Sequence, residues 1–335
     1  MLDQTAPAVT TPAAASRRAR GGLAPAALEW LCAALSPGGR VVDTRRLLGG
    51  VSRRVDLVCL EAADGRRHDV VVGRYVGHHH GDPIASCTRE FRLLGALAPF
   101  GFPAPRPLLL EADGAPFGAP TLVMTRLPGR PRLALGRLDV DTYLRRIAHL
   151  LADLHALPTA PFSFLPDQRT LTEASLAASA ANASCDDDLH RTLIQTVAHD
   201  WPSVRAAARR RVLVHGDYWP GNLLWSRGRL QGLIDWEEPA LGEPAQDVAT
   251  CRSDLTLFFG ASVADAFLAH YEAAVGRAVA HLRFWDLFVA TWVLPEFARW
   301  ADGWPALGRA DLTVDQARAR LKAFARANLA RSPDI

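Results

Sequence analysis

The sequence contains almost no lysine. Of its 38 basic residues, Lys322 is the only lysine, and all the others are arginines. A catalytic or ligand-binding lysine is therefore excluded throughout the first 321 residues. The formal net charge of +3 is small for 335 residues. It argues against the strongly basic surface of a nucleic-acid-binding protein.

Cysteines are few and dispersed. The five are Cys32, Cys59, Cys87, Cys185 and Cys251, and no two of them form a C-x-x-C pair. This pattern disfavours a zinc site or a disulfide framework and fits a reducing compartment. We therefore expect a cytoplasmic protein.

Long hydrophobic runs are also missing. No stretch approaches 18 uninterrupted apolar residues, so we expect no membrane-spanning helix. Arg17 and Arg18 form a pair within an Ala-, Thr- and Pro-rich segment, but Glu29 interrupts the apolar residues after that pair. Without a long apolar region, a twin-arginine signal is disfavoured. We interpret residues 1–22 as a disordered tail.

The remaining sequence is typical of a globular protein. Hydrophobic residues make up 49% of the chain and charged residues 22%. The length favours two lobes. The first, which we place at residues 23–127, is strand-rich: the patterns predict helices at 23–35 and 88–98 and strands at 41–48, 55–60, 70–76, 107–110 and 122–125.

Helical periodicity dominates after residue 127. The patterns predict helices at 141–156, at 171–200 with an interruption near Asp187, and over most of 245–331. A strand-loop-strand unit is predicted at 212–236. A strand-rich lobe followed by a larger helical lobe at 128–335 indicates an α+β protein.

The strand-loop-strand unit carries the strongest chemical signal. His215-Gly216-Asp217 follows an apolar run, Asn222 comes five residues after Asp217, and Asp235 ends the next apolar run. A turn at Ser226-Arg227-Gly228 brings the three polar side chains to one end of a small sheet. Carboxylate and amide oxygens are hard ligands that suit Mg²⁺ shared with phosphate oxygens. A metal-dependent hydrolase built on His215 and Asp217 is an alternative, but it leaves the spacing to Asn222 and Asp235 unexplained.

This pattern, His-Gly-Asp-x-x-x-x-Asn followed by Ile-Asp, resembles the catalytic core of the aminoglycoside phosphotransferase family. The string from Ile234 to Glu237 and then Gly242 to Ala249 resembles the family as well. The resemblance implies a bilobal protein-kinase-like fold. It also implies Asp217 as the residue that orients the attacking hydroxyl, and Asn222 and Asp235 as Mg²⁺ ligands. His215 and Asp247 are expected to brace the catalytic loop.

The N-terminal lobe extends the resemblance. Gly49, Gly50 and Ser52 resemble a nucleotide-covering loop, although Gly-Gly before a strand also fits a simple hairpin turn. Either Gly73 or Arg74 takes the phosphate-contacting position; strand alternation puts Arg74 on the face of Val70 and Val72 and favours it, since no lysine is near.

Further residues are assigned by the same resemblance. Glu90 resembles the helix glutamate that pairs with the phosphate-contacting cation, so we expect it to orient Arg74. The segment 122–129 resembles the interlobe hinge, which implies that Met124, Thr125 and Leu127 lie against the nucleotide base.

The function implied is a small-molecule kinase. It would use Mg²⁺ and ATP or GTP to phosphorylate a hydroxyl of a small acceptor, such as an aminoglycoside or another antibiotic. The expected partners are the nucleotide and the acceptor, without nucleic acid or membrane. A kinase of a metabolic alcohol or sugar, and a non-catalytic nucleotide-binding module of the same fold, are the alternatives.

Overall fold

The structure is a computed structural model that describes residues 22–47, 53–77, 81–133, 139–181, 187–208 and 210–333. Apart from Gly22, the predicted tail at residues 1–22 lies outside these ranges, as do Gly49, Gly50 and Ser52. Within the described part of the chain, no helix has the length and apolar character needed to cross a bilayer.

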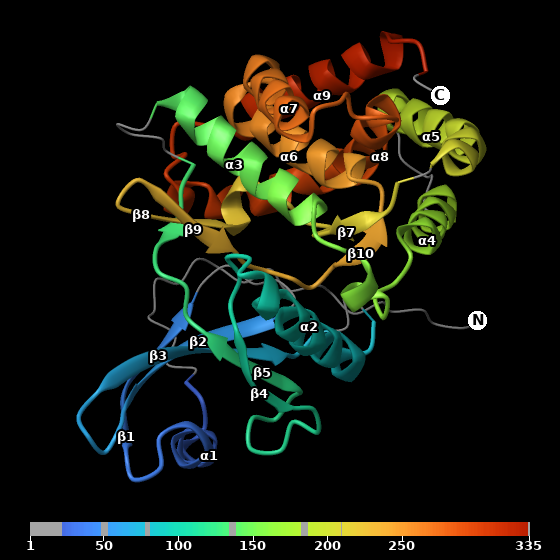
Figure 1. The fold of residues 1–335 in the computed structure, drawn as a ribbon. Coiled ribbons are helices and arrows are strands. Elements are labelled where there is room, and N and C mark those ends of the chain that lie inside the picture. Colours follow the sequence, from blue (N-terminus) through green and yellow to red (C-terminus); the bar gives the residue numbers. More distant parts are fainter. Residues whose placement is uncertain are drawn as a thin grey trace, which may run out of the picture.

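The N-terminal part is a sheet with one helix on each side (Figure 1). Five strands pair antiparallel in the order β1-β2-β3-β5-β4. Its elements are α1 (Pro25–Leu35), β1 (Arg40–Leu47), β2 (Arg53–Glu61), β3 (Arg67–Tyr75), α2 (Pro83–Leu97), β4 (Pro107–Glu111) and β5 (Thr121–Thr125). The predicted strands and both helices are present, each with ends shifted by a few residues.

Strand alternation divides this sheet into two apolar faces. Val70 and Val72 of β3 pack with Ala27 and Leu31 of α1 in one buried cluster. Tyr75 belongs to the other cluster, which includes α2 and continues into the C-terminal part. The face of the sheet that carries Tyr75 is therefore the one directed towards α2.

The C-terminal part is mainly helical, as predicted. Its helices are α3 (Val140–His155), α4 (Gln168–Ala181), α5 (Asp188–Ala207), α6 (Ala245–Phe259), α7 (Ala261–Val275), α8 (Leu282–Glu296) and α9 (Val314–Ala330). The apolar residues of α3 are buried along its whole length. The interruption before α5 is a helix cap, because the Asp187 carboxylate accepts the backbone N–H of Leu189 at 3.0 Å. The predicted α+β architecture is thus confirmed.

Short strands lie between the N-terminal sheet and the helices (Figure 1). They are β6 (Arg130–Pro131), β7 (Val212–Val214), β8 (Leu223–Ser226), β9 (Arg229–Leu233) and β10 (Ala240–Gly242). β7 pairs with β10, and β8 pairs with β6 and β9. β10 is not among the predicted strands, because three residues followed closely by Pro244 carry no strand periodicity.

The two parts are joined by packing and by backbone hydrogen bonds. The backbone N–H of Leu233 donates to Pro103 O at 2.9 Å, and the ring of Trp236 lies 5.9 Å from the ring of Phe102. Trp236 is fully buried and also lies 4.5 Å from the ring of His215. It therefore connects the His215-Gly216-Asp217 loop to the segment preceding β4.

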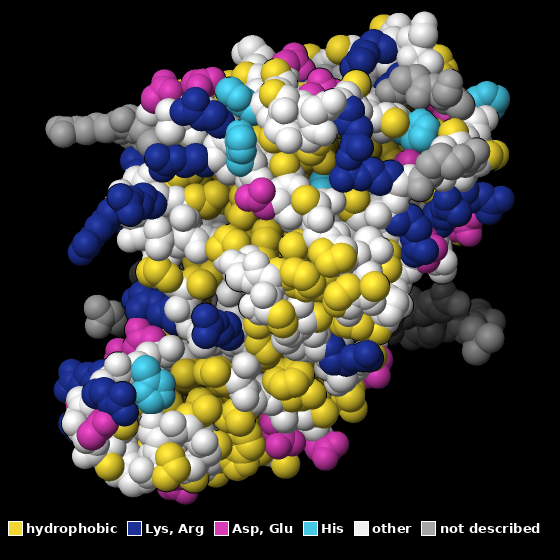
Figure 2. Space-filling view, viewed as in Figure 1, with side chains coloured by type: hydrophobic (Ala, Val, Ile, Leu, Met, Phe, Trp, Pro, Cys, Tyr) yellow, Lys and Arg dark blue, Asp and Glu magenta, His cyan; other side chains and the backbone are white. Residues whose placement is uncertain are grey.

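Charged side chains are spread over the surface. On the face shown in Figure 2, Arg and Lys side chains form separate groups, several of them beside Asp or Glu. Mixed charges of this kind are typical of a solvated surface.

We predict that Trp236→Ala lowers the free energy of unfolding by about 3–5 kcal/mol, because it leaves a cavity where a fully buried aromatic ring packs. Denaturant unfolding followed by circular dichroism measures this. The matched control is Trp300→Ala, whose ring is 38% exposed and whose loss should change stability far less. Equal effects of the two substitutions would contradict the interlobe role of Trp236.

Candidate active site

The loop after β7 contains a glycine, Gly216, that no other residue can easily replace. Gly216 has φ +86°, in the left-handed region, and a Cβ atom there would overlap the backbone carbonyl of Glu238. The loop thus packs directly on the chain that leaves β9. This close approach brings Asp217 near Asp235 and Glu238.

A buried carboxylate fixes the same loop. Asp247, in the first turn of α6, accepts the backbone N–H groups of His215 at 2.7 Å and Gly216 at 2.9 Å. His155 Nε2 lies 3.2 Å from the same carboxylate, and His155 Nδ1 lies 2.7 Å from the hydroxyl of Tyr271. The predicted bracing role of Asp247 is confirmed.

The side chain of His215 also braces the loop. Its Nε2 lies 3.1 Å from Ile234 O, which can only accept, so Nε2 carries the proton. Its Nδ1 then accepts the backbone N–H of Asp217 at 3.3 Å. Burial lowers the pKa of the imidazole, so His215 is neutral and acts as a structural link.

Asp217 and Asn222 face each other. The Nδ2 group of Asn222 donates to Asp217 Oδ2 at 2.8 Å and to Asp217 O at 2.9 Å. Burial raises the pKa of the Asp217 carboxyl well above its usual range, and the nearby Glu238, Asp235 and Asp254 raise it further. The carboxyl thus lies in a strongly negative environment that a cation would relieve.

Asp235 has an unusual backbone conformation. Its φ is +69°, which is rare for a residue with a side chain and is often found at functional positions. The preceding residue is fixed by the N–H of Ile234, which donates to Asn222 O at 3.0 Å. The structure therefore brings Asp217, Asn222 and Asp235 together as the spacing predicts.

On the N-terminal side, Arg53 of β2 contacts this cluster. Its guanidinium donates to Glu90 of α2 at 2.7 Å and also pairs with Asp235 and Glu237. Glu90 is buried and accepts the hydroxyl of Tyr75 as well. Burial would lower the pKa of Arg53, but the surrounding acidic groups keep that pKa well above its ordinary value. Arg53 therefore remains charged.

The predicted orientation of Arg74 by Glu90 is wrong. Arg74 donates to the buried carboxylate of Asp56 at 2.8 Å. Alternation along β3 does place Arg74 on the face of Val70 and Val72, but that face is covered by α1, whereas Glu90 lies on α2. The cation that pairs with Glu90 is Arg53.

The other predicted nucleotide contacts lie along the hinge segment. Met124 is buried in β5, with its Cε 3.9 Å from where a Cβ at Gly73 would lie. Thr125 Oγ1 accepts the backbone N–H of Arg106 at 2.8 Å. Leu127 lies against Gly232 of β9, between the two parts of the molecule. Their contact with a nucleotide base stays a prediction. The nucleotide-covering role of Gly49, Gly50 and Ser52, which lie outside the described residues, also stays a prediction.

Sequence reasoning missed three charged residues at this site. The sequence does contain a pattern that points to Asp254. This residue follows Asp247 by seven positions, which is two turns of the same helix. Glu238 follows the Asp-Trp-Glu string directly. Arg53 has only a weak signal, since nothing in its local sequence distinguishes it from Arg54.

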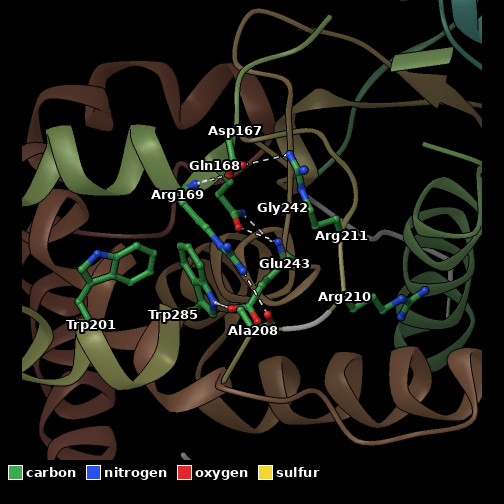
Figure 3. A pocket seen from close by; sticks show the side chains of 10 residues that line it. All are labelled: Asp167, Gln168, Arg169, Trp201, Ala208, Arg210, Arg211, Gly242, Glu243 and Trp285. Atoms are coloured by element: carbon green, nitrogen blue, oxygen red, sulfur yellow. Dashed lines mark hydrogen bonds and ion pairs between the residues drawn. The ribbon is translucent and has the colours of Figure 1, made fainter. Parts of the chain in front are cut away.

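A small cavity near β10 belongs to a structural network (Figure 3). The N–H of Glu243 donates to Gln168 Oε1 at 2.6 Å, and the indole N–H of Trp285 donates to the Glu243 carboxylate at 3.0 Å. The cavity volume is about 10 Å³, enough for about one water molecule. The network positions the start of α6, and hence Asp247.

Comparison with known proteins places these residues in a family context. Residues 45–285 match the model of the phosphotransferase enzyme family. Viomycin phosphotransferase from Streptomyces vinaceus is 28% identical over 237 residues, covering 63% of this chain and 78% of that protein. The mouse acyl-CoA dehydrogenase family member 10 is 29% identical over 178 residues, or 48% of this chain; the match spans only 16% of the mouse protein.

A solved structure shows the same fold. The GDP complex of aminoglycoside 2'-phosphotransferase-IIIa superposes with a TM-score of 0.59, covering 90% of this chain and 98% of that chain, at 18% identity.

We predict that Asp254 makes stability depend on pH. Burial raises its pKa from 3.8 to about 7, so the folded state is favoured while the carboxyl is protonated. This contribution is fully present below the unfolded-state value of 3.8 and is lost as the pH rises from there through about 7. Between pH 6 and 8 the wild type should therefore lose roughly 1 kcal/mol more stability than Asp254→Asn.

Denaturant midpoints at pH 6, 7 and 8 measure the difference. Asp113→Asn, on an exposed turn, is the matched control and should behave like the wild type. Parallel pH profiles for Asp254→Asn and the wild type would show that Asp254 does not titrate in this range.

Proposed function

Because the chain belongs to the phosphotransferase enzyme family, we propose that it is a small-molecule kinase. It transfers the γ-phosphoryl group of ATP or GTP to a hydroxyl of a small acceptor. The observation that carries this proposal is the convergence of Asp217, Asn222 and Asp235 where the N-terminal sheet meets the helical part. Its likeness to a phosphotransferase that binds GDP supports a nucleotide donor.

The residues present fit Mg²⁺. The amide nitrogen of Asn222 donates to Asp217, so the carboxamide oxygen of Asn222 points away from Asp217. Asp235 contributes a carboxylate that is 37% exposed. Among the described residues, no group of three or more His, Cys, Asp or Glu side chains is placed to hold a metal ion alone. One amide and one carboxylate oxygen suit Mg²⁺ shared with phosphate oxygens, which it would help to neutralise.

Asp217 acts on the acceptor in this proposal. Its carboxylate, held by Asn222, accepts a hydrogen bond from the attacking hydroxyl and orients it towards the γ-phosphorus. Most of the catalytic effect in phosphoryl transfer comes from positioning and charge neutralisation. The loop contacts of Asp247 and His215 limit the freedom of Asp217, which favours such positioning.

The acidic groups around Asp217 favour a cationic acceptor. Glu238 and Asp254 both raise the pKa of its carboxyl, and a positively charged acceptor would reverse this effect. Aminoglycosides and other amine-bearing antibiotics fit this requirement better than a neutral sugar. The use of ATP or GTP as the phosphoryl donor supports a cytoplasmic location. The dispersed cysteines support it as well.

We predict that Asp217→Asn retains nucleotide binding and loses phosphoryl transfer by about 10²–10⁴-fold, because the carboxylate that orients the hydroxyl is gone. Acceptor-dependent release of ADP or GDP, screened over aminoglycosides, other antibiotics, sugars and amino alcohols, measures transfer. Calorimetric titration measures binding. Asp302→Asn, at an exposed position, is the control. Wild-type turnover by Asp217→Asn with the identified acceptor would remove Asp217 from this role.

A separate prediction concerns the metal. Asp235→Ala should abolish Mg²⁺-dependent nucleotide binding, because it removes the only carboxylate of the proposed pair of ligands. The fold should survive, since Arg53 keeps Glu90 and Glu237 as partners. Calorimetry with and without Mg²⁺ tests this, with thermal unfolding as a check of the fold. An unchanged Mg²⁺-dependent affinity would contradict the assignment of Asp235.

A further inference from the structure

Nucleotide phosphates in such a site require a cation supplied by the protein. Mg²⁺ alone leaves a nucleoside triphosphate negatively charged, and enzymes that transfer its γ-phosphoryl group also contact the phosphates with a basic side chain. In protein kinases that side chain is a lysine on the third strand of the N-terminal lobe. In this chain the only lysine is Lys322, which lies on α9 and pairs with Asp187 at 2.7 Å.

The third strand does not direct a cation towards this site. Gly73 faces α2 and the helical part, on the same side of β3 as Tyr75, and has no side chain. Its neighbour Arg74 points to the α1 side, where Asp56 holds it. Neither residue of the predicted pair therefore presents a charge to the catalytic motif.

Arg53 occupies the corresponding space from the neighbouring strand. A Cβ built on Gly73 would lie 3.9 Å from Arg53 Cδ, within ordinary van der Waals contact. The guanidinium at the end of the Arg53 side chain contacts Glu90 on α2 and Asp235 at the catalytic motif. A long side chain at position 73 would extend into this same space.

We propose that Arg53 supplies the phosphate-contacting cation of this enzyme from β2, in place of a basic residue on β3. The proposal rests on the proposed kinase function and deepens it. Glu90 and Tyr75 orient the guanidinium from the N-terminal side. Its planar fork can bridge two phosphate oxygens, which a lysine ammonium does only as a point charge. Without nucleotide, the same fork is held by Asp235 and Glu237.

The test separates a phosphate contact from a structural role. Arg53→Met removes the charge but keeps an unbranched stem. We expect it to weaken binding of ATP or GTP with Mg²⁺, whichever the wild type binds, by about 10–100-fold, the range expected for losing hydrogen bonds to a charged group. Binding of the matching nucleoside, adenosine or guanosine, should stay within about twofold of wild type, since it has no phosphate. The control Arg54→Met, at an exposed position on the same strand, should bind both ligands like the wild type.

A rescue variant tests the spatial argument. Gly73→Lys combined with Arg53→Met returns a cation to β3, in the space that Arg53 leaves. We expect it to recover much of the triphosphate affinity without changing nucleoside binding. Should Arg53→Met not fold, Arg53→Met combined with Glu90→Gln removes the buried carboxylate that would be left unpaired, and the same comparison is made on that variant.

The outcomes distinguish the two proposals. If the wild type binds neither ATP nor GTP, the proposed function fails and the role of Arg53 fails with it. If the wild type binds the triphosphate and Arg53→Met binds it equally well, only the role of Arg53 is overturned. A parallel loss of triphosphate and nucleoside affinity would make Arg53 structural and also overturn it.

Discussion

The geometry of the candidate site depends on one buried carboxylate, that of Asp247. A fully buried charge is costly unless it is well hydrogen-bonded, and here two backbone N–H groups of the catalytic loop and the imidazole of His155 bind it. These bonds connect the loop to α6, to α3 and, through Tyr271, to α7. The direction in which Asp217 leaves the loop is therefore set by the helical core. A loop held only by its own residues would be far less constrained.

Periodicity and spacing predicted most of the fold and the centre of the site. The interval from Asp217 to Asn222 and the turn before Asp235 are local features, so one short hairpin is enough to bring them together. The third-strand residue could not be predicted in the same way. Strand alternation predicts that Gly73 and Arg74 point to opposite faces of the sheet, but which face meets α2 depends on the tertiary structure. Arg53 is harder still, because its partners Glu90 and Asp235 lie 37 and 182 residues away in the sequence.

The electrostatics of the site combine two opposing tendencies. Around Asp217, the acidic groups disfavour its own ionised form. Around Arg53, three carboxylates stabilise the guanidinium in a buried position. A cation next to Asp217 would lower its pKa and so favour the ionised carboxylate over the protonated form.

The near-absence of lysine also determines how this protein responds to covalent labelling. Nucleotide analogues that acylate amines require an unprotonated side-chain amine close to the phosphates, and a guanidinium does not become deprotonated in proteins. The one lysine, Lys322, is on α9 and is engaged by Asp187. Amine-directed nucleotide probes would thus leave the proposed nucleotide site unmodified, and a survey based on them would miss this protein. Dicarbonyl reagents, which react with guanidinium groups, are the chemistry suited to the proposed phosphate contact of Arg53.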